Sequence, residues 1–212
     1  WIGTDNGLNR FNPFTENVTR YHFNPTNKNT LTSNYITCIH VAKDNSIWIG
    51  TDNGLNVFNP HTNSFNALYQ KDGLSNNYIK SVIEDDTGNI WVGTNYGLNK
   101  VHRDDMSVNR YSEEDGLQSM EFNGAIYKDE EGWLYFGGIN GYNIIHPDSI
   151  KRNTTEPEIY ITSVNIHHHK SSGKTENSYE TRKLLSVDTI ELNYKQKYLS
   201  FDFVALNYVN ND

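Results

Sequence analysis

A nine-residue segment that occurs in three identical or closely similar copies is the feature that most restricts the fold of this chain. The segment WIGTDNGLN occupies residues 1–9 and again residues 48–56, and a close copy, WVGTNYGLN, occupies residues 91–99. A degenerate fourth copy, YFGGINGYN, follows at residues 135–143. A catalytic motif normally occurs once, whereas a segment that recurs at regular spacing is normally a structural building block.

The spacing of the copies predicts the architecture. The first glycine of each copy recurs after 47, 43 and 44 residues, and the residues upstream of each copy are also related. The third upstream segment, at residues 117–138, carries one extra residue near Asn123. Asn-Gly and Asp-Gly turns separate short apolar runs, so each unit is predicted to hold four strands, which is typical of a β-propeller blade. We assign these residues to the structural repeat: Trp1, Gly3, Gly7, Trp48, Gly50, Gly54, Trp91, Gly93, Gly97, Gly137 and Gly141.

Composition agrees with an all-β fold and excludes several classes of protein. Aromatic residues make up 13% of the 212 residues, too many for a disordered chain, and Asn, Thr and Gly are frequent. The net charge is −8 and no basic face is evident in the sequence, and both disfavour nucleic-acid binding. A single cysteine, Cys38, cannot form an intrachain disulfide, and we expect it to be a buried, inert thiol in an inner strand. The sequence has no run of 18 apolar residues, so no membrane-spanning helix is predicted.

The repeats define the expected domain boundaries. Residues 1–150 hold about three and a half blades, of which the first lacks its innermost strand, so we expect the C-terminal blades of a propeller within a longer protein. Residues 151–156 read as a linker. Residues 157–212 contain strand-like segments at 157–166, 187–194 and 198–208, which predict an incomplete Ig-like β-sandwich. The fold class is therefore all-β.

The repeat resembles a known family. The pattern W-[IV]-G-T-x-x-G-L-N, with L-x-x-N-x-[IV] upstream, resembles the regulator-propeller repeat in the sensor region of hybrid two-component system sensors. The fourth copy at residues 135–147 resembles the last blade of such propellers, and the segments that start at Pro157 and Leu199 resemble the first half of the Y_Y_Y β-sandwich. The resemblance implies a periplasmic sensor, with a transmembrane helix and a histidine kinase outside these residues. It also implies a ligand derived from complex polysaccharides.

Positions that differ between the units are free to specialise, and those near the central channel are the candidates for ligand binding. The loops that lead into the innermost strands are residues 32–35, 75–78 and 118–123. Sugar sites combine aromatic platforms with amide and carboxylate groups, which these loops contain. The predicted ligand-binding residues are Tyr35, Tyr78, Glu121, Phe122 and Asn123. Tyr35 and Tyr78 also belong to the repeat, so a purely structural role is an alternative for both. Residues Glu121 to Asn123 depart from the repeat.

Other chemistry-bearing residues have simpler interpretations. His167, His168 and His169 are consecutive, so in a strand they point to alternate faces and are poor ligands for one metal ion. The acidic pairs, Asp85-Asp86 among them, fall at predicted turns and are expected to be solvated. No phosphate-binding loop, nucleophile elbow or zinc-protease motif occurs. We therefore predict no catalytic residue, no metal and no cofactor.

The sequence predicts an extracytoplasmic sensor module that binds an oligosaccharide and acts as a homodimer in the whole receptor. It binds no nucleic acid and reaches the membrane only through segments outside these residues. Two other hypotheses of function stay open. One is a propeller-type polysaccharide lyase or glycosidase, and the other is a propeller that binds proteins.

Overall fold

The computed structural model describes all residues except 151–157, 168–178, 184–190, 193, 195–197 and 207–212. The chain divides into two compact units, residues 1–151 and 152–212, and each is described by itself. The described elements are β-strands and three short 3-10 helices, which confirms the predicted all-β class. Within the described residues, no helix has the length and apolar character needed to cross a membrane.

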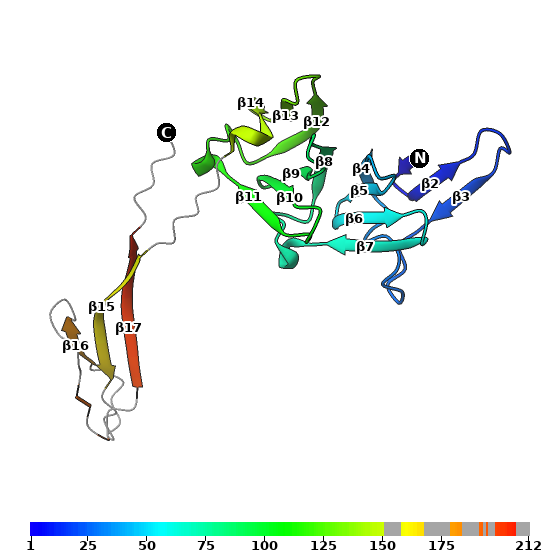
Figure 1. The fold of residues 1–212 in the computed structure, drawn as a ribbon. Helices are drawn as coiled ribbons and strands as arrows, with labels where there is room; N and C mark the ends of the chain where they lie inside the picture. Colours follow the sequence, from blue (N-terminus) through cyan, green and yellow to red (C-terminus); the bar gives the residue numbers. More distant parts are fainter. Residues whose placement is uncertain (151–157, 168–178, 184–190, 193, 195–197, 207–212) are drawn as a thin grey trace. The chain divides into compact units, whose positions relative to one another are not determined.

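The first unit consists of four antiparallel sheets, here called blades 1 to 4 (Figure 1). Blade 1 holds β1 (Ile2–Thr4), β2 (Gly7–Phe11) and β3 (Val18–Tyr21). Blade 2 holds β4 (Ile36–Val41), β5 (Ile47–Thr51), β6 (Gly54–Asn59) and β7 (Ser64–Leu68). Blade 3 holds β8 (Ile79–Glu84), β9 (Ile90–Thr94), β10 (Leu98–Val101) and β11 (Val108–Tyr111). Blade 4 holds β12 (Phe122–Lys128), β13 (Leu134–Gly138) and β14 (Gly141–Ile145).

The sheets confirm the predicted partial propeller. Blades 2 and 3 have the predicted four strands, each paired with the next strand along the chain, and blade 1 lacks an innermost strand, as predicted. Blade 4 differs from the four-strand prediction, because three strands are followed by a 3-10 helix, Pro147–Ser149. The innermost strands β4, β8 and β12 lie next to one another.

Antiparallel pairing fixes two faces of this array. The loops that lead into β4, β8 and β12 lie at one end of the blades, together with the turns at residues 52–53, 95–96 and 139–140; we call this end the top face. The turns between the first two strands of each blade, at residues 42–46, 85–89 and 129–133, lie at the opposite end, the bottom face. The alternation places every predicted ligand-binding loop on the top face.

Trp48, Trp91 and Gly50 lie at the contacts between blades. Trp48 is buried in a cluster that includes Leu74 and Ile79 of the next blade, and Trp91 is buried against Phe136 of blade 4. A Cβ atom built on Gly50 would lie only 2.7 Å from Ile79 Cγ2, so any other residue would push the blades apart. The repeat recurs because each blade meets its neighbour through the same contacts.

The second unit contains a three-stranded antiparallel sheet in the order β16-β15-β17. Its strands are β15 (Glu158–His167), β16 (Tyr179–Lys183) and β17 (Tyr198–Leu206). β15 and β17 confirm two of the predicted strands, and β16 lies between the predicted strand segments at 157–166 and 187–194. The predicted linker at 151–156, most of the predicted strand at 187–194, and His168 and His169 lie outside the described residues. The sandwich stays a prediction.

Candidate ligand-binding face

Two repeated hydrogen bonds hold the loops of the top face. The amide of the turn glycine in one blade donates to the loop that leads into the next blade, as Gly54 N does to Asn77 O at 2.7 Å and Gly97 N to Met120 O at 2.6 Å. Gly54 has φ +122°, a conformation that favours glycine. The loops are therefore fastened to the preceding blade by the backbone, which leaves their side chains free to differ.

The repeated asparagine provides the second bond. Its Oδ1 accepts from the amide of the second loop residue: Thr32 N donates to Asn56 at 2.9 Å, and Ser75 N donates to Asn99 at 2.8 Å. Asn56 and Asn99 are both buried. Each lies in the blade whose innermost strand follows the loop that it binds. Each loop is thus fixed on both sides before its variable side chains begin.

Three of the predicted residues occupy the same position in successive loops. Tyr35, Tyr78 and Glu121 each directly precede an innermost strand, and the structure places all three on the top face. Tyr35 and Glu121 are exposed. Tyr78 is half-buried, and the Lys80 ammonium lies 4.4 Å from the centre of its ring. This geometry presents aromatic faces and a carboxylate at one end of the blades, and their contact with a ligand stays a prediction.

Phe122 does not fit the prediction. Its side chain is only 1% exposed and packs edge-on against Phe136, at 6.1 Å between ring centres. It occupies the position of Ile36 and Ile79, which also begin innermost strands. The structure therefore places Phe122 in the hydrophobic core between blades 3 and 4, and we remove it from the candidate ligand contacts.

Asn123 has a structural task of its own. Its Nδ2 donates to Gly138 O at 3.3 Å, and its Oδ1 accepts from Ala125 N at 3.1 Å. These bonds lie at a β-bulge between Phe122 and Ile126, where β12 holds one residue more than the equivalent bulges of β4 and β8. The extra residue predicted near Asn123 is thus confirmed, and its exposed amide stabilises the bulge.

Sequence reasoning missed Tyr96. This side chain is 60% exposed on the turn between β9 and β10, where blades 1 and 2 have Asn6 and Asn53. The turn is tied to the predicted loop, because Asn95 N donates to Tyr78 O at 3.2 Å. The signal was present in the sequence, since Tyr96 is a departure from the repeat inside its most regular segment.

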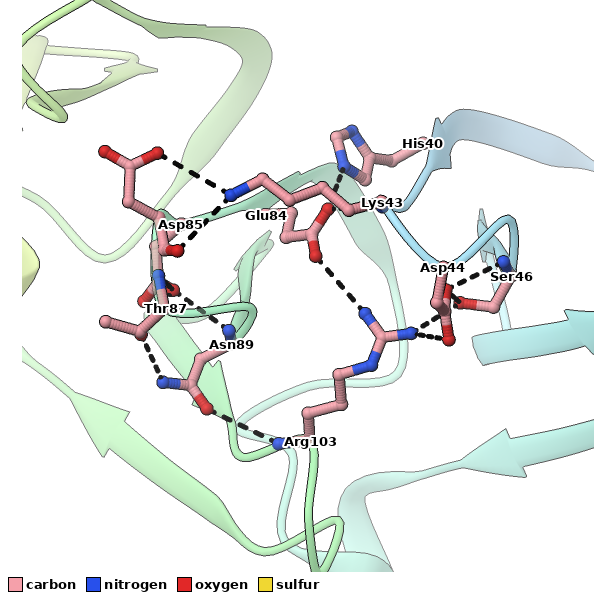
Figure 2. A network of polar contacts seen from close by, with 10 residues as sticks. His40, Lys43, Asp44, Ser46, Glu84, Asp85, Thr87, Asn89 and Arg103 are labelled. Carbon is pink, nitrogen blue, oxygen red and sulfur yellow. Dashed lines mark hydrogen bonds and ion pairs between the residues drawn. The ribbon is translucent and has the colours of Figure 1, made fainter.

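A network of charged residues joins blades 2 and 3 at the bottom face (Figure 2). Its centre is Glu84, whose side chain is 5% exposed. Glu84 accepts from Lys43 N at 2.8 Å and from the Arg103 guanidinium at 3.3 Å, and it lies 3.9 Å from His40 Nε2. Arg103 also contacts Asp44 across the blades. The bonds satisfy the buried carboxylate and fasten two blades, so we interpret the network as structural.

The electrostatics of this network follow from burial and from its partners. Burial lowers the pKa of His40, although the nearby Glu84 charge opposes this. Partial desolvation acts to raise the pKa of Asp44, but hydrogen bonds from Arg103 and Ser46, with the Arg103 charge, lower it to about 2. Burial also raises the pKa of Cys38 in β4 to about 11, which agrees with an inert thiol.

Asp85 corrects the expectation that the acidic turns are solvated. Its neighbour Asp86 is exposed, but Asp85 is fully buried. Its carboxylate accepts from the Trp91 indole at 2.9 Å and lies 3.7 Å from the Lys100 ammonium. Asp85 is therefore an internal acceptor for a core tryptophan. Among the described residues, no group of three or more His, Cys, Asp or Glu side chains is arranged to hold a metal ion.

The fold and this site define a class of protein: tandem β-propeller blades that keep a constant packing frame and vary their side chains on the top face. Comparison with known proteins finds a family model that matches two of the repeats. Residues 30–53 and 73–96 match the two-component regulator propeller family. These two segments are therefore similar to two-component regulator propeller repeats.

Solved structures extend the similarity beyond the two matched repeats. The extracellular domain of a protein from B. thetaiotaomicron described as a hybrid two component system, BT3049, is 28% identical over 97% of this chain and 27% of that chain, with a TM-score of 0.72. The corresponding domain of BT4673 from the same organism is 22% identical over 94% of this chain and 25% of that chain, with a TM-score of 0.52, and shows the fold alone. This chain thus spans about a quarter of each. No curated protein sequence matches it.

Proposed function

We propose that this chain is part of the periplasmic sensor region of a two-component receptor, and that its top face binds oligosaccharides released from complex polysaccharides. The observation that carries the sensor role is the similarity to the BT3049 extracellular domain over 97% of this chain. That similarity supports an extracytoplasmic location and a sensor role.

The top face supports an oligosaccharide as the ligand. Tyr35 and Tyr96 expose aromatic rings, and Glu121 exposes a carboxylate, at the ends of blades whose backbone is fixed. Aromatic rings pack against the apolar faces of sugar rings, while carboxylates accept from their hydroxyls. Rigid blades let these groups be placed without a large loss of conformational entropy when the ligand binds.

The signal is relayed mechanically under this proposal. Bound oligosaccharide favours one arrangement of propeller and sandwich over another, and a homodimeric receptor transmits the difference through the membrane to a histidine kinase outside these residues. A ligand can shift such an equilibrium only by its difference in affinity for the two arrangements. The ligand must therefore interact more favourably with one arrangement than with the other.

A thermal-shift screen of the full extracytoplasmic region tests this function. The probes are defined oligosaccharide fragments of starch, xylan, pectic galactan and levan. A ligand that binds only the folded protein raises the melting temperature, by an amount equivalent to about 2.7 kcal/mol at a hundred times its Kd. Release of shorter sugars from these probes would instead favour the lyase or glycosidase. Absence of both a shift and products would favour the protein-binding propeller.

A pair of variants locates the site of a positive probe. Tyr96→Ala removes an exposed ring from the top face, and Phe14→Ala removes an exposed ring from the bottom face of blade 1. Stacking of a ring on a ligand contributes on the order of 1 kcal/mol, so Tyr96→Ala should weaken binding about fivefold or more. Phe14→Ala should leave the affinity unchanged. Equal affinity in both variants would contradict the role of Tyr96 at the top face.

A further inference from the structure

A pair of hydroxyl groups recurs beneath the top face of blades 2 and 3. In blade 3, the Ser75 and Thr94 hydroxyl oxygens lie 3.0 Å apart, and Asn99 Nδ2 donates to Ser75 Oγ at 2.9 Å. In blade 2, Thr32 and Thr51 form the same pair at 2.9 Å. The repeated asparagine therefore has a hydroxyl partner in both blades.

The second hydroxyl of the pair also has fixed partners. Thr94 Oγ1 donates to Gly97 O at 2.8 Å and accepts from Tyr96 N at 3.0 Å, so it closes the turn between the second and third strands. Thr51 makes the same two bonds in blade 2, to Gly54 O and from Asn53 N. Each hydroxyl pair thus satisfies the asparagine, the turn carbonyl and the turn amide together.

Blade 4 lacks both hydroxyls. Gln118 stands at the position of Ser75, and Gly138 stands at the position of Thr94. Gln118 N still donates to Asn143 Oδ1 at 2.9 Å, so the asparagine keeps the orientation that it has in the other blades. Asn143 is 8% exposed, and its Nδ2 has no hydrogen-bond partner in the described structure. A buried donor without an acceptor costs free energy, and few are found in folded proteins.

Close packing explains why no side chain of blade 4 takes this place. A Cβ atom on Gly138 would lie 2.9 Å from Glu121 O, so a threonine cannot be accommodated there without a backbone shift. The Gln118 side chain is exposed and lies beside the turn, with its Nε2 3.2 Å from the position of a Cβ on Gly141. This side chain is unbranched and can move away from the corner at little cost.

We propose that the corner formed by Asn143, Gly138 and the Asn140–Gly141 turn binds two adjacent hydroxyls of a sugar ring, that is, a vicinal diol. The inference rests on the proposed oligosaccharide ligand and names the group that the top face recognises. Adjacent ring hydroxyls are separated by about the same distance as the oxygen pairs of blades 2 and 3. One oxygen accepts from Asn143 Nδ2, and the other donates to Gly141 O and accepts from Asn140 N.

The geometry also explains how such a site would be selective. The polar groups of the corner are already oriented by Gln118 N and by the turn, so a diol completes a pattern that the other blades complete with their own side chains. A ligand without adjacent free hydroxyls leaves these groups unpaired. A site built to hydrogen-bond hydroxyls therefore binds such a ligand much more weakly. Glu121, an exposed residue of the same loop, adjoins the corner through its backbone oxygen, which lies 2.9 Å from the position of a Cβ on Gly138.

Two variants that differ by one oxygen atom test the proposal. Gln118→Ser supplies the hydroxyl that Ser75 supplies in blade 3, which occupies Asn143 Nδ2 and blocks the diol. Gln118→Ala removes the same glutamine side chain without supplying an oxygen, and the proposed diol makes no contact with that side chain. The measurement is isothermal titration calorimetry of the full extracytoplasmic region with the oligosaccharide that gives the largest thermal shift.

We expect Gln118→Ser to lower the affinity about tenfold or more, and Gln118→Ala to keep it within about twofold. Gln118→Ser should also raise the melting temperature of the free protein by about 1–2 °C, because it satisfies a buried donor. Equal affinities of the two variants, or a loss of affinity in both, would overturn the diol site while leaving the oligosaccharide sensor intact. If no probe binds the unmodified protein, the proposed function fails first, and the diol site fails with it.

Discussion

Removal of the Asp85 carboxylate should destabilise the protein more than removal of any exposed charge. Asp85 is fully buried and accepts from Thr87 N at 3.0 Å, from Asn89 N at 2.9 Å and from the Trp91 indole at 2.9 Å. Lys100, which is 14% exposed, lies 3.7 Å from the same carboxylate. Asp85→Ala therefore leaves one buried indole donor and one largely buried ammonium without an acceptor.

The magnitude follows from these two groups. An unpaired buried donor costs about 1–3 kcal/mol, and breaking a buried ion pair by removing one partner costs about 3–5 kcal/mol. The two costs overlap because one carboxylate serves both groups, so we expect Asp85→Ala to lower the free energy of unfolding by about 3–5 kcal/mol. Urea denaturation followed by tryptophan fluorescence measures this, and at a slope of about 3 kcal/mol/M the midpoint falls by about 1–2 M.

Blade 2 supplies the matched control. Ala42 and Val57 stand there at the positions of Asp85 and Lys100, and the Trp48 indole is a buried donor with no partner in the described structure. The double variant Asp85→Ala with Lys100→Val copies this arrangement into blade 3 and removes the unpaired charge. It should recover about half of the loss. A single-variant loss below about 1 kcal/mol, or a double variant less stable than Asp85→Ala, would refute the reasoning.

Three further predictions concern packing and pH. Trp48→Ala should cost about 3–5 kcal/mol in urea denaturation, because the side chain fills the contact between blades 2 and 3; a loss below about 1 kcal/mol would contradict this. The pKa of Asp44 falls from its ordinary 3.8 to about 2 in the folded protein, so its contact with Arg103 stabilises the fold above about pH 4 and is lost as the pH falls toward 2. The side chain is half exposed, so the contribution is below about 1 kcal/mol, and a matched pH titration of Asp44→Asn should lack it. Phe122→Ala should cost about 3–5 kcal/mol while Tyr35→Ala costs less than about 1 kcal/mol; similar losses would contradict the core assignment of Phe122.

Internal repetition made the frame of the fold predictable. A residue that recurs at one position in several units, such as Gly50 or Asn99, must meet a contact that also recurs, and the structure shows these contacts between and within the blades. The missing innermost strand of blade 1 and the extra residue of β12 were also predictable, because both are differences in length between aligned units.

Side-chain direction and charge burial were harder to predict. Glu121 and Phe122 are adjacent departures from the repeat, but strand geometry sends one outward and the other into the core. Aspartate is typical of solvated turns, so Asp85 was predicted to be exposed. Ala42, the equivalent residue of blade 2, is apolar and indicates a buried position. Tyr96 was missed because it lies inside a segment that is otherwise constant.

Hydrogen exchange of the full extracytoplasmic region, with and without the oligosaccharide that raises its melting temperature most, tests the central claim most directly. Ligand binding should slow exchange in the top-face segments 31–35, 74–78, 95–97, 117–123 and 139–141, and should change exchange little in the bottom-face turns 42–46 and 85–89. Protection confined to the bottom face, or to residues outside these blades, would contradict the placement of the ligand on this face.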